Sequence, residues 1–158
     1  MSQDHPIVIV GPAHPLRGGI AHFNESFARA LAQQNQRVRI VSFYLQYPAI
    51  LFPGKSQKTD EAPPDDLHID PWLSSINPIS WMVTARRIAA MKPKMVVFRF
   101  WLPFMGPALG TVARYLAKRN IPVIGLVDNA IPHEPRPMDR RWSKWFFRHC
   151  TAFVTLSK

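Results

Sequence analysis

The chain has little cysteine and lacks long apolar runs. Cys150 is the one cysteine among 158 residues, which excludes an internal disulfide and any metal site made only of cysteines. Because an apolar stretch follows Cys150, we expect a small buried hydrophobic residue rather than a reactive thiol. The uncharged runs 40–54 and 71–85 stop at 15 residues and contain proline. They are shorter than the roughly 20 residues that span a bilayer.

Targeting and metal-binding patterns are also missing. The N-terminus is polar and carries Asp4, so no signal peptide is expected. The predicted location is cytoplasmic, with peripheral attachment at the inner membrane as an alternative. No His, Cys, Asp or Glu spacing indicates zinc or iron. The acidic segment 60–66 lacks the glycine of a calcium loop, so no metal and no cofactor are expected.

Proline, by contrast, is abundant. Sixteen prolines occur in a chain that is 47% hydrophobic, a content too high for a disordered protein. Stiff connections between packed elements are therefore expected, and the length fits one domain, 1–158. No internal repeat is evident.

Apolar stretches of strand type alternate with amphipathic stretches of helix type. This alternation with short connections predicts an α/β fold, a Rossmann-like parallel sheet flanked by helices. On the first helix we expect Ile20, Phe23, Phe27, Ala30 and Leu31 to share the apolar face. The predicted strands are 6–10, 38–43, 67–70, 95–100, 121–127 and 152–156, and the predicted helices are 19–34, 77–91, 105–119 and 139–149.

The turn between the first strand and the first helix contains Arg17, Gly18 and Gly19. Glycine lets the backbone approach a ligand closely, and the N–H groups at the helix start suit a diphosphate. Arg17 is placed to bind the same phosphates bidentately. The spacing matches neither the dinucleotide fingerprint nor the P-loop, and an ordinary turn is the alternative.

Further motifs extend along the chain: Gln46-Tyr47-Pro48, Leu51-Phe52-Pro53-Gly54-Lys55, Asn77-Pro78, Phe98-Arg99-Phe100-Trp101-Leu102-Pro103, Asp128-Asn129 and Pro132-His133-Glu134. With the glycine turn, they make the chain resemble the N-terminal half of two-domain (GT-B) glycosyltransferases of family four, the glycogen-synthase-like group. The resemblance implies transfer of a sugar from a nucleoside-diphosphate donor to a hydroxyl acceptor without a metal. It also implies that a C-terminal donor-binding domain is absent from these residues, so that they are inactive alone.

Polar segments follow the predicted strands, and ligands of such sheets bind at the carboxyl ends of the strands. Family members often carry a histidine after the fifth strand, near the transferred sugar. Asp128 occupies that position here, so the catalytic role falls to Asp128 or to His133. Capping of the loop backbone by Asp128 is the alternative. The residues expected to bind the acceptor are Tyr47, Trp101, Asn129 and Glu134.

The charge is uneven, with a net −1 over residues 1–83 and +11 over 84–158. Such an excess points to a polyanionic partner, or to a solvated basic surface. In the last predicted helix, Arg140, Arg141, Lys144 and Arg148 lie within about 100° of one another, opposite to an aromatic face. This arrangement suits an anionic membrane surface. No base-stacking module accompanies it, so no nucleic-acid partner is expected.

The sequence thus predicts the acceptor-side domain of a glycosyltransferase with a nucleoside-diphosphate sugar, a hydroxyl acceptor and an anionic membrane surface as partners. One alternative is a non-catalytic Rossmann-like binding protein for phosphate or anionic-lipid ligands. A second is a nucleic-acid-binding domain, which would bind duplex with a steep dependence on salt.

Overall fold

Six parallel strands form one sheet in a computed structural model that describes residues 5–50, 58–128 and 136–156. The strand order is β3-β2-β1-β4-β5-β6, so the predicted Rossmann-like α/β class is confirmed. The strands are β1 Ile7–Val10, β2 Val38–Leu45, β3 Ile69–Ser74, β4 Met95–Phe100, β5 Val123–Val127 and β6 Ala152–Thr155. The helices are α1 Gly19–Gln33, α2 Pro78–Ala90, the short 3₁₀ turn η1 Pro103–Met105, α3 Gly106–Ala117 and α4 Asp139–Phe147.

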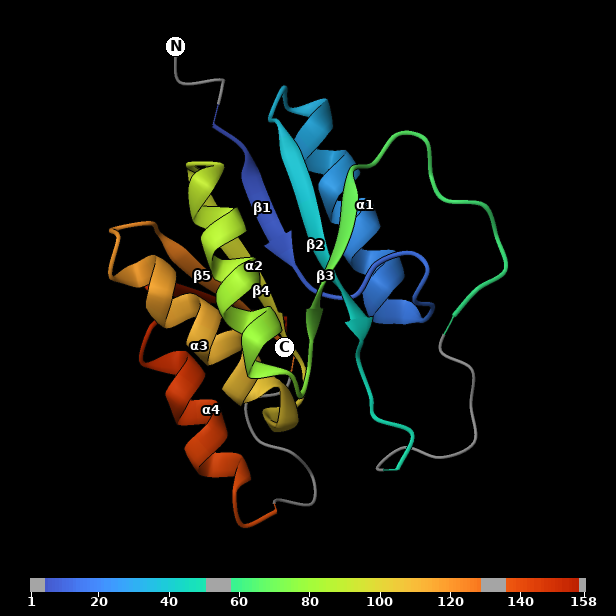
Figure 1. Ribbon diagram of the computed structural model, residues 1–158. Coiled ribbons are helices and arrows are strands. Elements are labelled where there is room, and N and C mark those ends of the chain that lie inside the picture. The colour runs from blue at the N-terminus through green and yellow to red at the C-terminus, as the bar shows by residue number, and fades with distance from the viewer. Residues whose placement is uncertain (1–4, 51–57, 129–135, 157–158) are drawn as a thin grey trace.

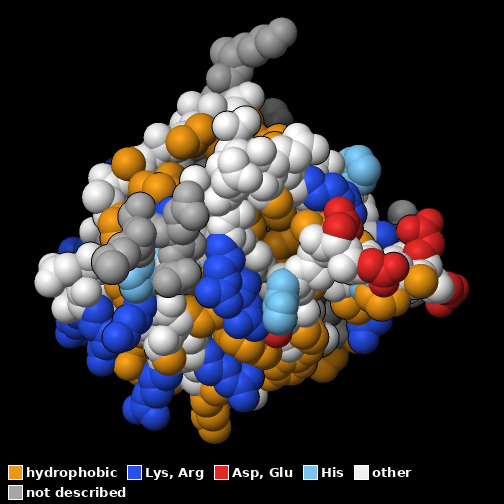
Figure 2. All heavy atoms as spheres, turned by 90° about the horizontal axis from the view of Figure 1, so that it is seen from above, with side chains coloured by type: hydrophobic (Ala, Val, Ile, Leu, Met, Phe, Trp, Pro, Cys, Tyr) orange, Lys and Arg blue, Asp and Glu red, His pale blue; other side chains and the backbone are white. Residues whose placement is uncertain are grey.

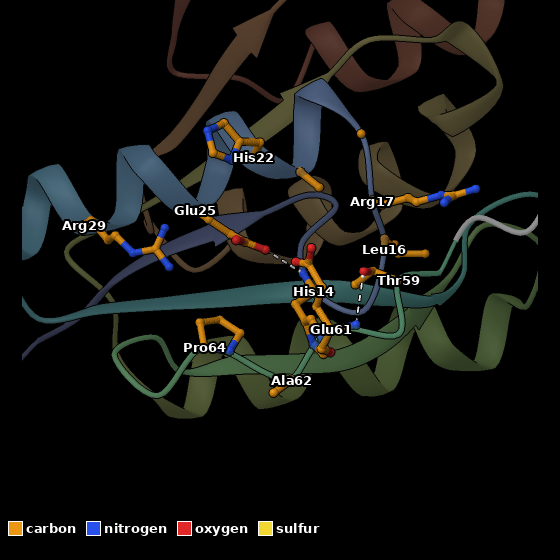
Figure 3. Close-up of a pocket in the computed structure, with 12 residues that line it drawn as sticks. His14, Leu16, Arg17, His22, Glu25, Arg29, Thr59, Glu61, Ala62 and Pro64 are labelled. Atoms are coloured by element: carbon orange, nitrogen blue, oxygen red, sulfur yellow. Dashed lines mark hydrogen bonds between the residues drawn. The ribbon is translucent and has the colours of Figure 1, made fainter.

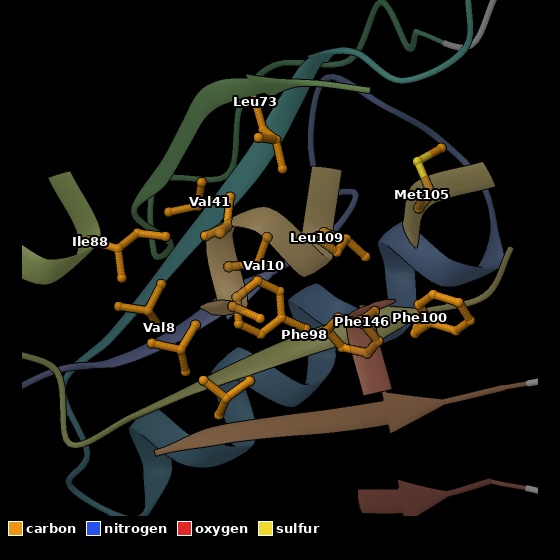
Figure 4. Packing of buried hydrophobic residues seen from close by; sticks show 14 of the residues in the cluster. Val8, Val10, Val41, Leu73, Ile88, Phe98, Phe100, Met105, Leu109 and Phe146 are labelled. Atoms are coloured by element: carbon orange, nitrogen blue, oxygen red, sulfur yellow. The ribbon is translucent and has the colours of Figure 1, made fainter. Parts of the chain in front are cut away.

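The helices cover the two faces of the sheet unequally (Figure 1). Helices α2, α3 and α4 pack on one face, where β1, β2, β4 and β5 contribute alternate side chains such as Val8, Val41 and Phe98 to the larger core. Figure 4 shows this core closed by Leu109 and Phe146 from the helices. Helix α1 alone covers part of the opposite face. Full burial of each such side chain contributes roughly 1.5–3 kcal/mol.

Two expectations about elements need correction. The third strand begins at Ile69 and continues to Ser74 instead of ending at residue 70. Its Pro71 is tolerated because β3 is an edge strand, paired only with β2. The prediction for α1 was also partly wrong, since Phe23 is 37% exposed. Ala30 is exposed as well, whereas Phe27 and Leu31 pack against the core as predicted. The most deeply buried residues of the helix are Ala21, Asn24 and Ala28, because small side chains allow the closer approach.

The sequence contains no Asp or Glu between Asp70 and Asp128, a stretch that includes α2 and α3. In α4 the one acidic residue, Asp139, is buried and accepts a hydrogen bond from the backbone of Arg136. The layer made by these three helices is therefore positively charged. None of the helices in the described part of the chain has the length and apolar character required to cross a bilayer.

Candidate functional site

The β1–α1 loop at the carboxyl edge of the sheet is held by hydrogen bonds on both sides. The Ala13 N–H donates to Ser42 Oγ at 3.1 Å, and Asn24 Nδ2 donates to the carbonyl of Pro12 at 2.9 Å. The His14 N–H donates to Glu25 Oε1 at 2.8 Å. Gly11 packs so closely against Asn24 and Arg99 that a Cβ at this position would overlap both. These contacts fix the path of the chain into α1.

At the end of this loop, Gly18 and Gly19 are exposed and open to the surroundings. Gly18 has φ +124°, a left-handed conformation that side chains disfavour. A Cβ at either glycine would have no atom of the described residues within 4 Å. The N–H of His22 donates to the Gly18 carbonyl, so the helix begins here. The geometry therefore leaves space for a ligand at the start of α1.

A hollow of about 440 Å³ lies beside this turn (Figure 3), with Arg17 and Gly18 in its wall. Its other boundary is the segment 59–64. The Thr59 N–H of this segment donates a hydrogen bond to the Pro15 carbonyl of the β1–α1 loop at 2.8 Å. In the same wall, Arg29 is paired with Asp66, and its guanidinium lowers the pKa of that carboxyl. Asp128, Tyr47 and Trp101 are not among the residues lining this hollow.

Asp128 lies directly after β5 and forms an ion pair with Arg99 of β4. The Nε and Nη2 atoms of Arg99 donate to the two carboxylate oxygens at 2.8 and 2.5 Å. The guanidinium also lies 4.3 Å from the ring centroid of Phe23 on α1. Arg99 is 5% exposed at its side chain and Asp128 is 20% exposed. Asp128 is thus fixed in orientation and still reaches the surface.

Arg99 was expected only as part of a motif and without a role of its own, although the sequence carries a signal for it. A charged residue inside the apolar strand MVVFRF is rarely buried without a partner. Its partner is 29 residues away, beyond the reach of sequence spacing alone. Asn24 and Ser42, which fix the glycine loop, were missed for the same reason.

Two residues expected to bind the acceptor lie together. Trp101 Nε1 donates to the hydroxyl of Tyr47 at 2.8 Å, and the Trp101 ring meets Phe43 edge-on. Three further expected residues, Asn129, His133 and Glu134, lie outside the described residues. The carboxyl edge therefore carries three separate groups: the glycine turn, the Arg99–Asp128 pair and the Tyr47–Trp101 pair.

The four expected basic residues, three on α4 and Arg148 at its C-cap, are all exposed, while Phe146 is buried on the opposite side. Trp145 lies under the guanidinium of Arg114 from α3. Cys150 is half-buried and its thiol donates weakly to the carbonyl of Phe146. Burial raises the pKa of this thiol to about 12, which fits the expected unreactive residue.

The described residues include no group of three His, Cys, Asp or Glu side chains that could hold a metal ion. No protein-family model and no curated protein sequence matches the chain. Among solved structures, MurG of Acinetobacter baumannii is similar, with a TM-score of 0.60 and 12% sequence identity. The alignment covers 96% of this chain and 41% of MurG. The chain thus spans about two fifths of the length of that neighbour.

This likeness establishes the fold, which matches the N-terminal domain of MurG. At 12% sequence identity the likeness shows the fold alone, and it does not confirm family four.

Proposed function

We propose that this chain is the acceptor-side domain of a glycosyltransferase that moves a sugar from a nucleoside diphosphate to a hydroxyl acceptor. The open glycine turn at the start of α1 carries the proposal, because Gly18 and Gly19 leave space where helix N–H groups favour an anion. In this proposal Arg17, Gly18 and Gly19 contact the donor diphosphate. A second domain completes the donor site.

The other roles follow from the same edge of the sheet. A carboxylate that accepts two hydrogen bonds from a guanidinium keeps free lone pairs. Asp128 can therefore accept a hydrogen bond from the acceptor hydroxyl or from the transferred sugar, and His133 is the alternative group for this task. Tyr47 and Trp101, with Asn129 and Glu134, contact the acceptor in this proposal.

The test uses an enzyme with both domains and a panel of nucleoside-diphosphate sugars. Gly19→Val places a branched side chain in the space reserved for the diphosphate, so we expect weaker donor binding by calorimetry with an unchanged circular dichroism spectrum. Ala30→Val, on an exposed position of the same helix, is the matched control. Equal donor affinity in both variants would exclude the turn as the diphosphate site. Donor binding without any transfer would favour the non-catalytic alternative.

We also propose that the helical layer attaches the domain peripherally to an anionic membrane. The observation that favours it is the set of exposed cations on α4, in the same layer as α2, which exposes Ile79, Met82 and Val83 on the other side of α3. Co-sedimentation with phosphatidylglycerol vesicles is expected at low salt and is expected to disappear at high salt. Equal binding to phosphatidylcholine vesicles would contradict an electrostatic attachment.

A further inference from the structure

A second hollow, of about 420 Å³, lies at the opposite edge of the sheet, where the strands begin. It forms where α2 and α3 end and where the chain enters β4 and β5. The residues around it are His5, Ala89, Lys92, Pro93, Lys94, Arg119 and Ile121. Three of them carry permanent positive charges, one is a histidine, and none of these described lining residues is acidic.

Helix dipoles account for only part of this charge. The C-termini of α2 and α3 both face this edge, and each carries about half a negative charge. The two termini thus offset about one of the three positive charges. Figure 2 looks onto this edge from above, and most of the acidic side chains lie far to the right, away from the Lys and Arg side chains on the left. The described residues therefore leave a positive potential at the hollow.

Lys92 has a backbone conformation that lysine disfavours. Its φ is +48°, in the left-handed region, where the chain leaves α2. Two other helices leave the same way through Asn35 and Asn120, each at φ 58°. Asparagine tolerates this conformation, whereas lysine adopts it only at an energetic cost. The cost at Lys92 is consistent with a use for its ammonium group at this position.

The neighbouring cations are held in place by local contacts. The guanidinium of Arg119 lies 3.5 Å from the ring centroid of Tyr115, and its Nη1 donates to the Tyr115 carbonyl at 3.2 Å. Lys94 Nζ donates to Gln36 Oε1 at 2.8 Å, which holds its ammonium group beside the hollow. Ordered donors around a concave surface lose less entropy when they bind a ligand.

We propose that this hollow is a binding site for a phosphate-type anion, formed by Lys92, Lys94 and Arg119. Tetrahedral oxyanions accept several charge-assisted hydrogen bonds at once, which a guanidinium and two ammonium groups supply. The site lies at the edge of the sheet opposite to the proposed transferase site, so it does not depend on the proposed function. A free phosphate ester and a phospholipid headgroup share this chemistry.

The test titrates the purified protein with inorganic phosphate and diphosphate against chloride at matched ionic strength, by calorimetry and thermal unfolding. We expect saturable binding that raises the unfolding temperature. Lys92→Asn and Arg119→Gln are expected to weaken it about tenfold each, because each removes a charge-assisted contact. Without phosphate, Lys92→Asn is expected to unfold at the same or a higher temperature, since Asn fits the left-handed conformation.

Lys58→Gln is the matched control, because it also removes one exposed positive charge, outside both the hollow and the basic layer of helices. A parallel arm replaces phosphate by phosphatidylglycerol vesicles. Binding in solution identifies a free phosphate, and binding only to vesicles that Lys92→Asn abolishes identifies a headgroup. The proposal is overturned if neither probe binds, or if Lys58→Gln weakens binding as much as the two variants in the hollow.

Discussion

At the residue scale, the Arg99–Asp128 pair makes the clearest energetic prediction. Removal of one partner from a buried ion pair leaves the other charge uncompensated, which costs about 3–5 kcal/mol. Arg99 is nearly fully buried, whereas Asp128 reaches the surface and can recover water. We therefore expect Arg99→Met to lower the free energy of unfolding by about 3 kcal/mol, and Asp128→Asn to lower it by less. Urea denaturation measures both.

The double variant Arg99→Met/Asp128→Asn provides the control for this pair. Because it removes both charges, its loss of stability is expected to be smaller than the sum of the two single losses. Strict additivity would mean that the ion pair contributes nothing to the fold.

His149 gives a prediction about pH. Burial lowers the pKa of His149 below its ordinary value of 6.5, and the positive charges of Arg148, Arg114 and Lys118 lower it further. The unfolded chain therefore takes up this proton at a higher pH than the folded chain does. Stability from the neutral imidazole is present above about pH 6.5 and is lost as the pH falls toward the lower folded-state pKa.

The measurement compares the free energy of unfolding of the wild type with that of His149→Gln at pH 8 and pH 5. We expect the wild type to lose more stability than the variant between these two values. Parallel losses would show that His149 does not titrate differently in the two states.

Some residues of the candidate site could be predicted from the sequence, and others could not. The glycine pair and the Tyr47–Trp101 pair belong to loops at the ends of apolar strands, so the strand pattern alone placed them at one edge of the sheet. Arg99 and Asn24 act through partners distant in the sequence, which only the folded chain identifies. The roles proposed for Asp128 and His133 stay predictions.

At the element scale, two glycines determine how α4 docks. A Cβ at Gly106 would overlap the backbone carbonyl of Trp142, and a Cβ at Gly110 would overlap the ring of Trp145. The backbone at Trp142 has little room to move, so Gly106→Ala is expected to cost about 1–3 kcal/mol through overpacking. Gly19→Ala, where nothing lies within 4 Å, is the matched control and is expected to be neutral or slightly stabilising.

Both variants are measured by chemical denaturation, with the near-ultraviolet circular dichroism of the tryptophans as a report on α4. A Gly106→Ala protein as stable as the control would contradict the close packing of α3 on α4. This packing could not be predicted from hydrophobic periodicity, because glycine has no apolar side chain.

The same limit explains why the face predicted for α1 was partly wrong. Hydrophobic periodicity weights large side chains, so it favoured Phe23 together with Phe27 and Leu31. The last two do pack on the core, but the closest approach to the sheet is at the small residues Ala21 and Ala28. The strands were easier to predict, since buried parallel strands are continuous apolar runs.

At the scale of the whole molecule, the uneven charge could be predicted from the sequence, and the structure shows on which face the positive charges lie. The C-terminal excess of +11 includes the exposed cations of α2, α3 and α4, which belong to a single layer over one face of the sheet. Acidic side chains such as Glu61 and Asp66 belong to the segment beside α1. The positive and the acidic side chains therefore lie on different sides of the molecule. Attraction to an anionic membrane would turn the layer of α2, α3 and α4 toward the membrane.

That orientation leads to a prediction about vesicle binding. Each basic residue near an anionic leaflet contributes about 1 kcal/mol, so the four cations of α4 together contribute about a thousandfold in partitioning. Arg141→Glu/Lys144→Glu reverses two of these charges and is expected to lower partitioning into phosphatidylglycerol vesicles by more than a hundredfold. Lys58→Glu alters an exposed cation of the segment beside α1 and is expected to change partitioning by less than tenfold. Co-sedimentation at low salt measures both. Similar losses per reversed charge on the two sides would mean that net charge alone attracts the protein, with no preferred face.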